Sequence, residues 1–328
     1  ESSAALRLDQ PVWTGGRITA GIEAAASRLD VAGATLNETR LEMTLRVIAA
    51  YSEAMRQKAR EGYADIGVAE HEKLLAMIDR RVKQQVSSQI DHRLAESRLF
   101  QAQNDLSLIS QARQNALTQL SQLSGSPVSD IDLAGLDEVG PPASLEEAQA
   151  LALAASPSLR RLRHEEAAAT ADIKSRRSAY FPQVVLRLEH LMSESSDDSR
   201  GLVVLQAQPG AGLSAGTGVE AAIARREAIL LSREAVEREI RERITLDWHE
   251  WTAARSRFAV ARQSSEIANE VFESYTRQYV IGRKSWIDVL NAVRETMLAR
   301  FTQADAQAQS VAAGLRLQAQ IGAMKINE

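Results

Sequence analysis

Two kinds of short motif in this sequence carry residue types that often do chemistry. The stretch Gly210-Ala211-Gly212-Leu213-Ser214-Ala215 follows an apolar segment and opens a helical pattern, as the phosphate-binding turn of a dinucleotide site does. Pro209 interrupts that arrangement, and more than 100 residues follow without the second parallel strand that such a site requires. The glycines therefore indicate a turn and not a nucleotide site.

The pairs His249-Glu250 and Asp91-His92 combine residue types that bind metals. However, the 5 histidines never stand four residues apart, the spacing that places two imidazoles on one helix face. The chain has no cysteine, which excludes thiolate catalysis and cysteine-ligated zinc. Because no acid, base, nucleophile or metal set converges, we expect no enzyme activity, no bound metal and no cofactor.

Charge and hydropathy exclude two further classes of protein. The 328 residues include 43 acidic and 39 basic side chains, a net charge of −4 that argues against a nucleic-acid partner. No stretch of 18 consecutive apolar residues occurs, so the sequence predicts no transmembrane helix. With only 4 Trp, 5 Tyr and 5 Phe, the core must consist of small and aliphatic side chains.

The prolines leave room for very long helices. All 7 lie outside the runs 12–126 and 210–328, and proline in a helix interior costs about 3 kcal/mol. The two runs also repeat each other, since Gly21-Ile22-Glu23-Ala24-Ala25 matches Gly218-Val219-Glu220-Ala221-Ala222 at an offset of 197 residues. The same offset places Ile90-Asp91 on Ile287-Asp288. An internal duplication therefore predicts two similar helical hairpins.

The first helix of the second hairpin is expected to run from about Gly218 to Ile281, roughly 95 Å. Its inward positions recur at alternating spacings of three and four, the pattern of a coiled coil, and are Trp251, Ala254, Phe258, Ala261, Ser265, Ala268, Phe272, Tyr275 and Tyr279. Trp248 and Trp251 could mark a binding groove, but this pattern makes helix packing the better explanation. A turn is expected at Gly282–Ser285 with Ser285 as N-cap, and its counterpart near Gln85–Ser88 has glutamine in place of Gly282.

Three strands are predicted, because apolar and polar residues alternate at the start of the chain and after Pro182. The segment Ser193–Ser199 reads as a polar hairpin loop, and Gly201–Gln208 as the strand that follows it. A short helix should begin near Leu145, and Ser156-Pro157 is a typical start of another.

These elements divide the chain into seven segments: a strand at 1–14, a helical hairpin at 15–125, an inter-repeat segment at 126–156, a lead-in helix at 157–181, a β-hairpin at 182–210, a second helical hairpin at 211–322 and a tail at 323–328. The first repeat has no lead-in helix and one strand fewer than the second. A whole duplication would therefore place about 60 further residues before Glu1.

Three motifs are similar to those of the TolC family of outer-membrane channel proteins. They are Ala179-Tyr180-Phe181-Pro182-Gln183, Gln10-Pro11-Val12-Trp13-Thr14-Gly15-Gly16, and the segment from Tyr279 to Leu290. The resemblance implies a mainly α fold with a small β part, in which antiparallel helical hairpins form an α-barrel tunnel across the periplasm. It also implies that the strands contribute to a trimeric β-barrel in the bacterial outer membrane.

The resemblance also implies roles for individual residues. Asp288 and Asn291 correspond to a pore constriction, and Tyr279, Lys284 and Asp91 to a network that holds the closed state. Three symmetry-related carboxylates in a narrow pore would attract cations. The alternatives are that Asp288 caps its helix, that Tyr279 packs in the coiled-coil seam and that Lys284 is a solvated charge.

Polar strand residues are expected to face the channel lumen, while the apolar residues between them face lipid. A buried sheet of a soluble protein is the alternative. The expected lumen-facing residues are Arg7, Asp9, Arg187 and Glu189, and the expected lipid-facing residues are Leu6, Leu8, Val184, Leu186 and Leu188.

The resulting functional expectation is a passive exit duct of a three-part export system. Its partners would be two further copies of the chain, a periplasmic adaptor (membrane fusion protein), an inner-membrane transporter and outer-membrane lipid. The cargo could be a protein in type I secretion or small molecules in efflux, and the segment Val86–Asp91 slightly favours secretion. The alternative is a soluble coiled-coil adaptor or scaffold of the periplasm, which would need no amphipathic strands.

Overall fold

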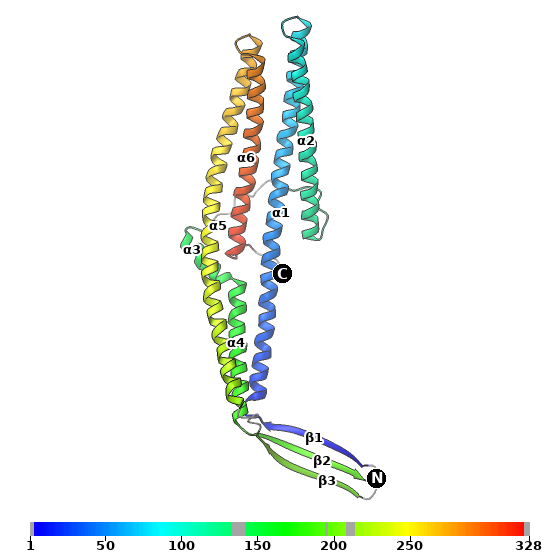
Figure 1. The fold of residues 1–328 in the computed structure, drawn as a ribbon, viewed down its shortest axis with the longest axis vertical. Coiled ribbons are helices and arrows are strands. Elements are labelled where there is room, and N and C mark those ends of the chain that lie inside the picture. The colour runs from blue at the N-terminus through cyan, green and yellow to red at the C-terminus, as the bar shows by residue number, and fades with distance from the viewer. Residues whose placement is uncertain (1–2, 133–141, 194–195, 208–213, 325–328) are drawn as a thin grey trace. The chain divides into compact units, whose positions relative to one another are not determined.

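The computed structural model describes residues 3–132, 142–193, 196–207 and 214–324. Figure 1 shows its helices and strands, which follow in chain order as β1 (Ser3–Trp13), α1 (Arg17–Lys83), α2 (Gln89–Ser124), α3 (Leu145–Ala155), α4 (Pro157–Arg177), the 3-10 turn η2 (Ser178–Tyr180), β2 (Gln183–Ser193), β3 (Ser196–Gln206), α5 (Ala215–Val280) and α6 (Trp286–Gln320). Most of the described chain is therefore helical, as predicted. The motif at Gly210–Leu213 and most of the tail at 323–328 lie outside the described residues.

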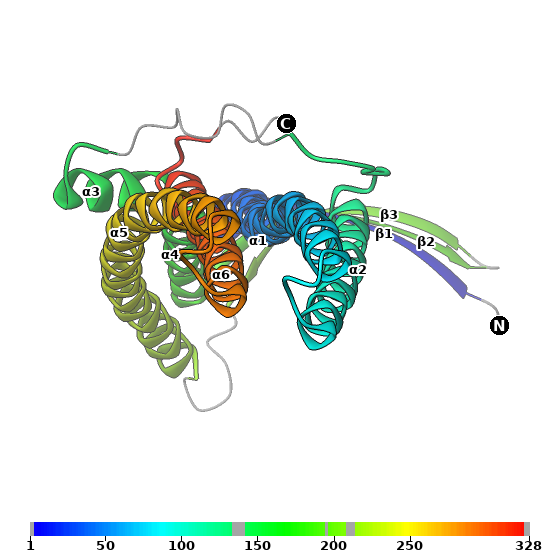
Figure 2. The same ribbon diagram turned by 90° about the horizontal axis from the view of Figure 1, so that it is seen from above.

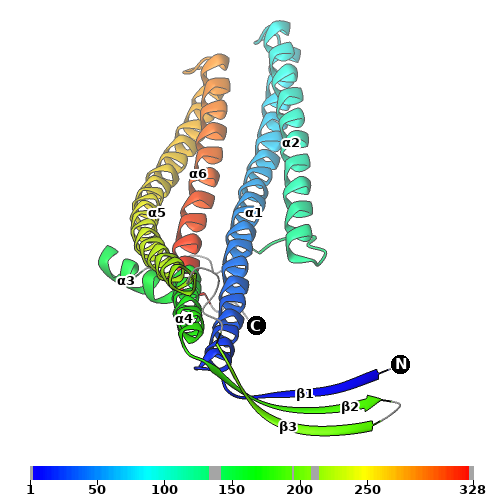
Figure 3. The same ribbon diagram turned by 60° about the horizontal axis from the view of Figure 1, so that its bottom comes forward.

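The predicted duplication is visible in the helices. α1 has 67 residues and α5 has 66, so each is about 100 Å long. In Figure 3, α2 folds back along α1 and α6 folds back along α5, which gives two antiparallel hairpins. All nine predicted seam residues of α5 are buried or half-buried, so the coiled-coil pattern is confirmed.

The chain forms two compact units, and neither coincides with one repeat. Unit 1 comprises residues 1–39 and 156–240, and unit 2 comprises residues 40–155 and 241–328. The three strands, α4 and the beginnings of α1 and α5 belong to unit 1. The rest of both hairpins, with α3, belongs to unit 2. Each unit therefore contains parts of both repeats.

Unit 1 contains an antiparallel sheet in the order β1-β2-β3. The loop predicted at Ser193–Ser199 is wrong, because β2 continues to Ser193 and β3 already begins at Ser196, with these two residues paired. The serines and aspartates predict a loop, yet the pairing of the two strands is made by backbone hydrogen bonds, which every residue type except proline can supply. The hairpin is therefore longer than the sequence indicates.

Helix α4 packs against both long helices of unit 1. It begins as predicted, with Ser156 as N-cap accepting from the Leu159 N–H at 3.2 Å and Pro157 in the first turn. Ion pairs join it to α1, such as Arg28 to Asp172 at 3.0 Å, and to α5 through Arg233 and Glu166 at 2.8 Å. The helix ends five residues before Pro182. Unit 1 is thus a three-helix assembly that carries the sheet.

Unit 2 has two apolar clusters, and each contains residues of both hairpins. The first lies next to the helix turns and includes Leu74, Ile78, Ala95, Phe272, Tyr279, Trp286, Val289, Leu290, Ala292 and Val293. The second includes Ala50, Ala54, Met55, Ala116, Leu117, Leu120, Ile131, Ala308 and Val311. The buried alanines of these clusters let the helices approach closely, and the two hairpins lie side by side (Figure 2).

The inter-repeat segment is tied to the first hairpin by one aspartate. Lys58 Nζ lies 2.8 Å from Asp130 Oδ2, and an Arg113 Nη donates to Asp130 Oδ1 at 2.8 Å. Arg113 also pairs with Glu61 at 2.7 Å. The hydrogen bonds from Lys58, from the Ile131 N–H and from Arg113 hold the pKa of Asp130 well below its usual range. Within the described residues, no helix is long and apolar enough to cross a membrane.

Candidate functional site at the helix turns

The two helix turns of unit 2 have the same backbone hydrogen bonds at an offset of 197 residues. In the second hairpin, the Gly282 N–H donates to Tyr279 O at 3.0 Å and the Arg283 N–H to Gln278 O at 2.9 Å. In the first, the Gln85 N–H donates to Val82 O and the Val86 N–H to Arg81 O, both at 2.9 Å. The duplication is therefore retained in the turn geometry.

Gln85 adopts the left-handed conformation that glycine usually supplies. Its φ is +60°, close to the +74° of Gly282 at the equivalent position. A side chain in this region costs about 1–2 kcal/mol because its Cβ approaches the following carbonyl oxygen. The turn predicted near Gln85–Ser88 therefore forms, although glutamine and not glycine holds the left-handed position.

Both second helices begin with a capping box. The Asp288 N–H donates to Ser285 Oγ at 3.2 Å, while Ser285 N and Oγ both donate to Asp288 Oδ2, at 3.0 and 2.8 Å. Ser88 and Asp91 make the same reciprocal pair at the start of α2. The side-chain and backbone hydrogen bonds from Ser285 lower the pKa of Asp288, with a smaller effect of Lys284. Both carboxylates therefore stabilise helix starts, as the capping alternative states.

Tyr279 joins the two hairpins. Its side chain is 5% exposed, and its ring lies 5.4 Å from the ring of Trp286. The guanidinium of Arg81 on α1 lies 4.7 Å from the Tyr279 ring centre, and the Tyr279 hydroxyl lies 3.4 Å from Ser87 Oγ. The first two contacts are packing and a cation–π interaction, and the third is a long hydrogen bond.

The structure does not bring Tyr279, Lys284 and Asp91 together within one chain. Lys284 Nζ lies over the ring of Tyr275 at 4.0 Å, and Asp91 is in its capping box. The contacts of Arg81 and Ser87 with Tyr279 are not predicted by the sequence. The second repeat has Gln278 and Lys284 at the equivalent positions, so the internal duplication does not single out these two residues. Trp286 stands in the quoted motif but was not assigned a role.

Asn291 stands one helical turn after Asp288 and is exposed. It lines a cavity between the hairpins together with Leu290 and Arg294. Asn291 therefore lies on the same helix as Asp288, but it borders this cavity, whereas Asp288 is held in the capping box.

The charged strand residues lie together on one face of the sheet in unit 1. The register pairs Arg7 with Glu189 and Asp9 with Arg187. Asp9 accepts from Arg187 Nε at 2.7 Å, and Glu189 lies 2.8 Å from Arg200 of β3. This face thus carries a continuous ion-pair network.

The opposite face of the sheet is apolar and exposed. It presents Leu6 and Leu8 of β1 beside Leu186 and Leu188 of β2, with Val203 and Leu205 of β3. The strand alternation read from the sequence is therefore confirmed as two chemically different faces. Within the ranges that the structure describes, His, Asp and Glu side chains form no group of three that could hold a metal ion.

Comparison with known proteins agrees with this architecture. The family model described as outer membrane efflux protein matches residues 1–126 and 149–323. A membrane protein from Pseudomonas aeruginosa has a TM-score of 0.80 at 18% identity, over 98% of this chain and 83% of that chain. A comparison with curated proteins gave no match.

Two solved outer-membrane proteins give similar values. The outer membrane protein VceC from Vibrio cholerae has a TM-score of 0.78 at 16% identity, over 98% of this chain and 86% of that chain. The open state of the MtrE outer membrane channel of Neisseria gonorrhoeae has a TM-score of 0.79 at 18% identity, over 98% and 80%. At these identities the likeness shows the fold, and the fold class expected from the sequence is confirmed.

Proposed function

We propose that this chain, which belongs to the outer membrane efflux protein family, is the exit duct of an export system in the bacterial outer membrane. It would conduct substrate passively, without catalysis or a cofactor. The single observation that carries this proposal is that the parts of α1 and α5 in unit 1 each have an exposed apolar seam in addition to the seam that the chain itself covers.

The covered seam of α1 faces α4. Its members are buried or half-buried and recur at spacings of four and three, and they are Ala20, Ala24, Ser27, Val31, Ala34 and Glu38. A second seam is displaced by two residues, which corresponds to about 200° around the helix. Its members are all exposed and are Ile18, Ile22, Ala25, Leu29, Ala32 and Leu36, with Leu29 75% exposed and Ile22 65% exposed.

Helix α5 repeats this arrangement with smaller side chains. Its covered seam consists of Val219, Ala222, Arg226, Ile229, Arg233, Val236 and Ile240, all buried or half-buried. Two residues further along, the exposed seam consists of Ala221, Ala224, Ala228, Leu231 and Ala235. An exposed seam of this kind leaves apolar area in water unless another helix covers it.

The two exposed seams differ in a way that favours contact between copies of the chain. The α1 seam projects large side chains, and the α5 seam offers alanines between which they can insert. A contact between two different faces of identical chains is heterologous, and such contacts form a ring when the rotation between neighbouring copies closes. We therefore infer a homotrimer whose helices line a tunnel, the assembly expected for this family.

The sheet fits the same assembly. Its apolar face would contact outer-membrane lipid, while the network of Arg7, Asp9, Arg187, Glu189 and Arg200 would face the lumen. An open sheet edge is unstable in hydrocarbon, and three copies would remove the edges by closing a barrel. In each copy this network would present three arginines and two carboxylates to the lumen.

The helix turns are the proposed constriction. Three copies of Asp288 would form a ring of carboxylates, with Asn291 one turn further along α6. Tyr279 would hold the two hairpins together through Arg81 and Ser87, while Lys284 and Asp91 remain available for contacts between copies. A periplasmic adaptor and an inner-membrane transporter are the proposed partners at this end. The family's description favours efflux over protein secretion as the process.

Reconstitution tests the proposal. The purified protein added to a planar lipid bilayer should give long-lived, uniform conductance steps. A soluble coiled-coil scaffold or adaptor, an alternative that the comparisons do not support, would give no steps and would stay in the aqueous fraction without detergent. That result would overturn the proposed function.

A further inference from the structure

A buried ion pair joins the two hairpins of unit 2. Arg300 of α6 donates from Nη1 to both carboxylate oxygens of Glu70 on α1, at 3.1 and 3.2 Å. The two side chains are only 12% and 14% exposed. A second ion pair between the same helices, Arg60 with Asp305, is longer at 3.7 Å, and its side chains are 28% and 35% exposed. Water and salt therefore screen the pair of Arg300 and Glu70 less than the ion pairs on the surface.

Arg300 also contacts α5, the other helix of its own hairpin. Its Nη2 donates to Oδ1 of Asn269 at 2.6 Å, and Nδ2 of Asn269 donates to Glu273 at 3.0 Å. A guanidinium holds its donors in one rigid plane, so its direction toward Glu70 and its direction toward Asn269 are coupled. Both contacts are therefore satisfied together in only one placement of α1 against α5 and α6.

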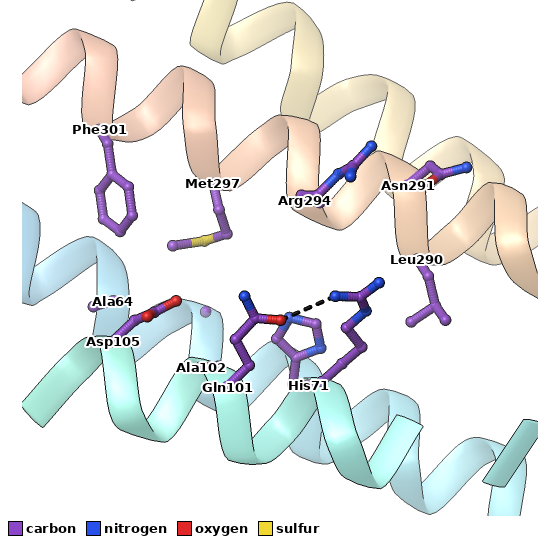
Figure 4. A pocket seen from close by; sticks show the side chains of 12 residues that line it. Ala64, His71, Gln101, Ala102, Asp105, Leu290, Asn291, Arg294, Met297 and Phe301 are labelled. Atoms are coloured by element: carbon purple, nitrogen blue, oxygen red, sulfur yellow. Dashed lines mark hydrogen bonds between the residues drawn. The ribbon is translucent and has the colours of Figure 1, made fainter. Parts of the chain in front are cut away.

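The helices α1 and α6 approach closely beside this ion pair. A Cβ on Gly67 would lie 2.8 Å from the methyl carbon of Met297, so this methyl group occupies the space that a side chain at Gly67 would take. Figure 4 shows Met297 pointing from α6 toward the helices of the first hairpin, and its sulfur lies 3.8 Å from Nη1 of Arg300. Gly67 and Met297 each stand about one helical turn before Glu70 and Arg300. The close approach and the ion pair thus form one contact region.

Apolar packing by itself sets the alignment of the two hairpins only weakly. Each hairpin is aligned by its own short turn, whereas α2 and α5 are separated by residues 125–214. Where the hairpins meet, both contribute small buried side chains, among them Ala50 and Ala54 of α1 and Ala308 of α6. Contacts between alanines are non-directional and remain similar after a shift of one helical turn. A buried ion pair is broken by such a shift, which leaves its charges unpaired.

We propose that Arg300 is a positioning residue, which fixes the axial register of the second hairpin against the first through Glu70 and Asn269. Glu70 and Arg300 each stand about 15 residues from the turn of their hairpin, or 22 Å along the helix. The register set by this contact aligns the two turns and so places Tyr279 beside Arg81. This role does not depend on the proposed export function.

NMR of the protein in detergent, with carbon-13 in the methionine methyl groups, tests this role. Met55 is buried where the hairpins meet, and Met77 packs against the apolar cluster next to the turns, so both report the register away from Arg300. Each should give one resonance in the wild type. Glu70→Leu with Arg300→Leu should keep a melting temperature near that of the wild type, since apolar replacement of a buried ion pair is often neutral. Its Met55 and Met77 resonances should nevertheless split or broaden.

Charge reversal separates the register from general packing. Glu70→Arg with Arg300→Glu keeps an ion pair at the same place and should restore one resonance for each reporter methionine, whereas Arg300→Glu alone should not. The matched control is Arg93→Leu with Glu96→Leu, because these residues form a surface ion pair within α2 and join no two helices. Its spectrum should match that of the wild type. Met192 of β2 lies in unit 1, and its resonance should stay unchanged in every variant.

Single wild-type resonances of Met55 and Met77 in folded Glu70→Leu with Arg300→Leu would overturn the proposal. If that variant does not fold, the comparison of Arg300→Glu with the charge-reversed protein decides, and equal spectra of these two would also overturn it. A protein that gives no conductance in bilayers would contradict the proposed function and leave these spectra unaffected.

Discussion

The guanidinium of Arg81 lies over the ring of Tyr279, 4.7 Å from its centre, and so links the last turn of α1 to the last turn of α5. This contact joins the two hairpins of one chain directly at their turns. Trp286 packs on the same tyrosine from α6. The contact between the two turns therefore depends on a residue of the first repeat, Arg81, that has glutamine at the equivalent position of the second.

Arg81→Gln should raise single-channel conductance in planar bilayers. The substitution removes a cation–π contact worth about 0.5–1 kcal/mol, which lets the hairpins separate more often. Tyr279→Phe with Lys284→Ser should also raise it, but Lys284→Ser alone should have a smaller effect because Lys284 contacts Tyr275. Equal conductance of Arg81→Gln and wild type would show that this contact does not restrain the turns.

The pore role of Asp288 can be separated from its capping role. Ser285→Ala removes the cap and should lower the free energy of unfolding by about 1 kcal/mol, while cation selectivity stays unchanged. Asp288→Ala also removes the capping box, but it should in addition change the cation selectivity of the channel and its block by multivalent cations. Recordings of Asp288→Ala that match the wild type would leave this carboxylate with a capping role alone.

The two left-handed turn residues give a stability prediction that is independent of function. Gln85→Gly should stabilise unit 2 by about 1 kcal/mol, since glycine adopts φ of +60° without the Cβ penalty. Gly282→Gln should destabilise it by a similar amount. Chemical unfolding of both variants measures the difference, and a destabilised Gln85→Gly would mean that the glutamine side chain contributes more than its backbone costs.

Leu29→Glu should dissociate the proposed trimer, because it places a charge in the exposed α1 seam. Leu29→Met is the matched control, since it keeps an apolar side chain of similar volume. Ala228→Glu should have the same effect from the α5 side. Light scattering in detergent measures the mass of each variant. If folded Leu29→Glu forms a complex of the same mass as the wild-type protein, this seam is not part of the interface between copies.

Asp130 predicts a pH-dependent stability. Its folded-state pKa lies below the unfolded value near 3.8, so the stabilisation by Lys58 and Arg113 is present at neutral pH. It is lost as the pH falls below about 4 toward the folded-state pKa. Asp130→Asn should therefore melt below the wild type at pH 7, with a gap that narrows at pH 3.

The matched control for this measurement is Asp65→Asn, an exposed aspartate of α1 with no ion pair among those found in the described residues. Its melting temperature should follow the wild type throughout. A gap between wild type and Asp130→Asn that stays constant from pH 7 to pH 3 would contradict the assignment.

Features with a local signal were predictable from the sequence. Ser156-Pro157 and Ser285 mark helix starts because capping depends on neighbouring residues, and the seam ending at Tyr279 follows from helical periodicity. The partner of Tyr279 was not predictable, because Arg81 reaches it only through packing of two hairpins. The loop predicted at Ser193–Ser199 is wrong because backbone pairing between β2 and β3 outweighs the local polarity of the sequence.

The central claim is that identical chains surround a hollow axis. A three-dimensional map of the detergent-purified protein by electron cryomicroscopy tests it most directly. The account predicts three copies, with the exposed seam of α1 in one copy against that of α5 in the next and an open passage between the helices. A solitary chain, or an assembly with a filled centre, would contradict it.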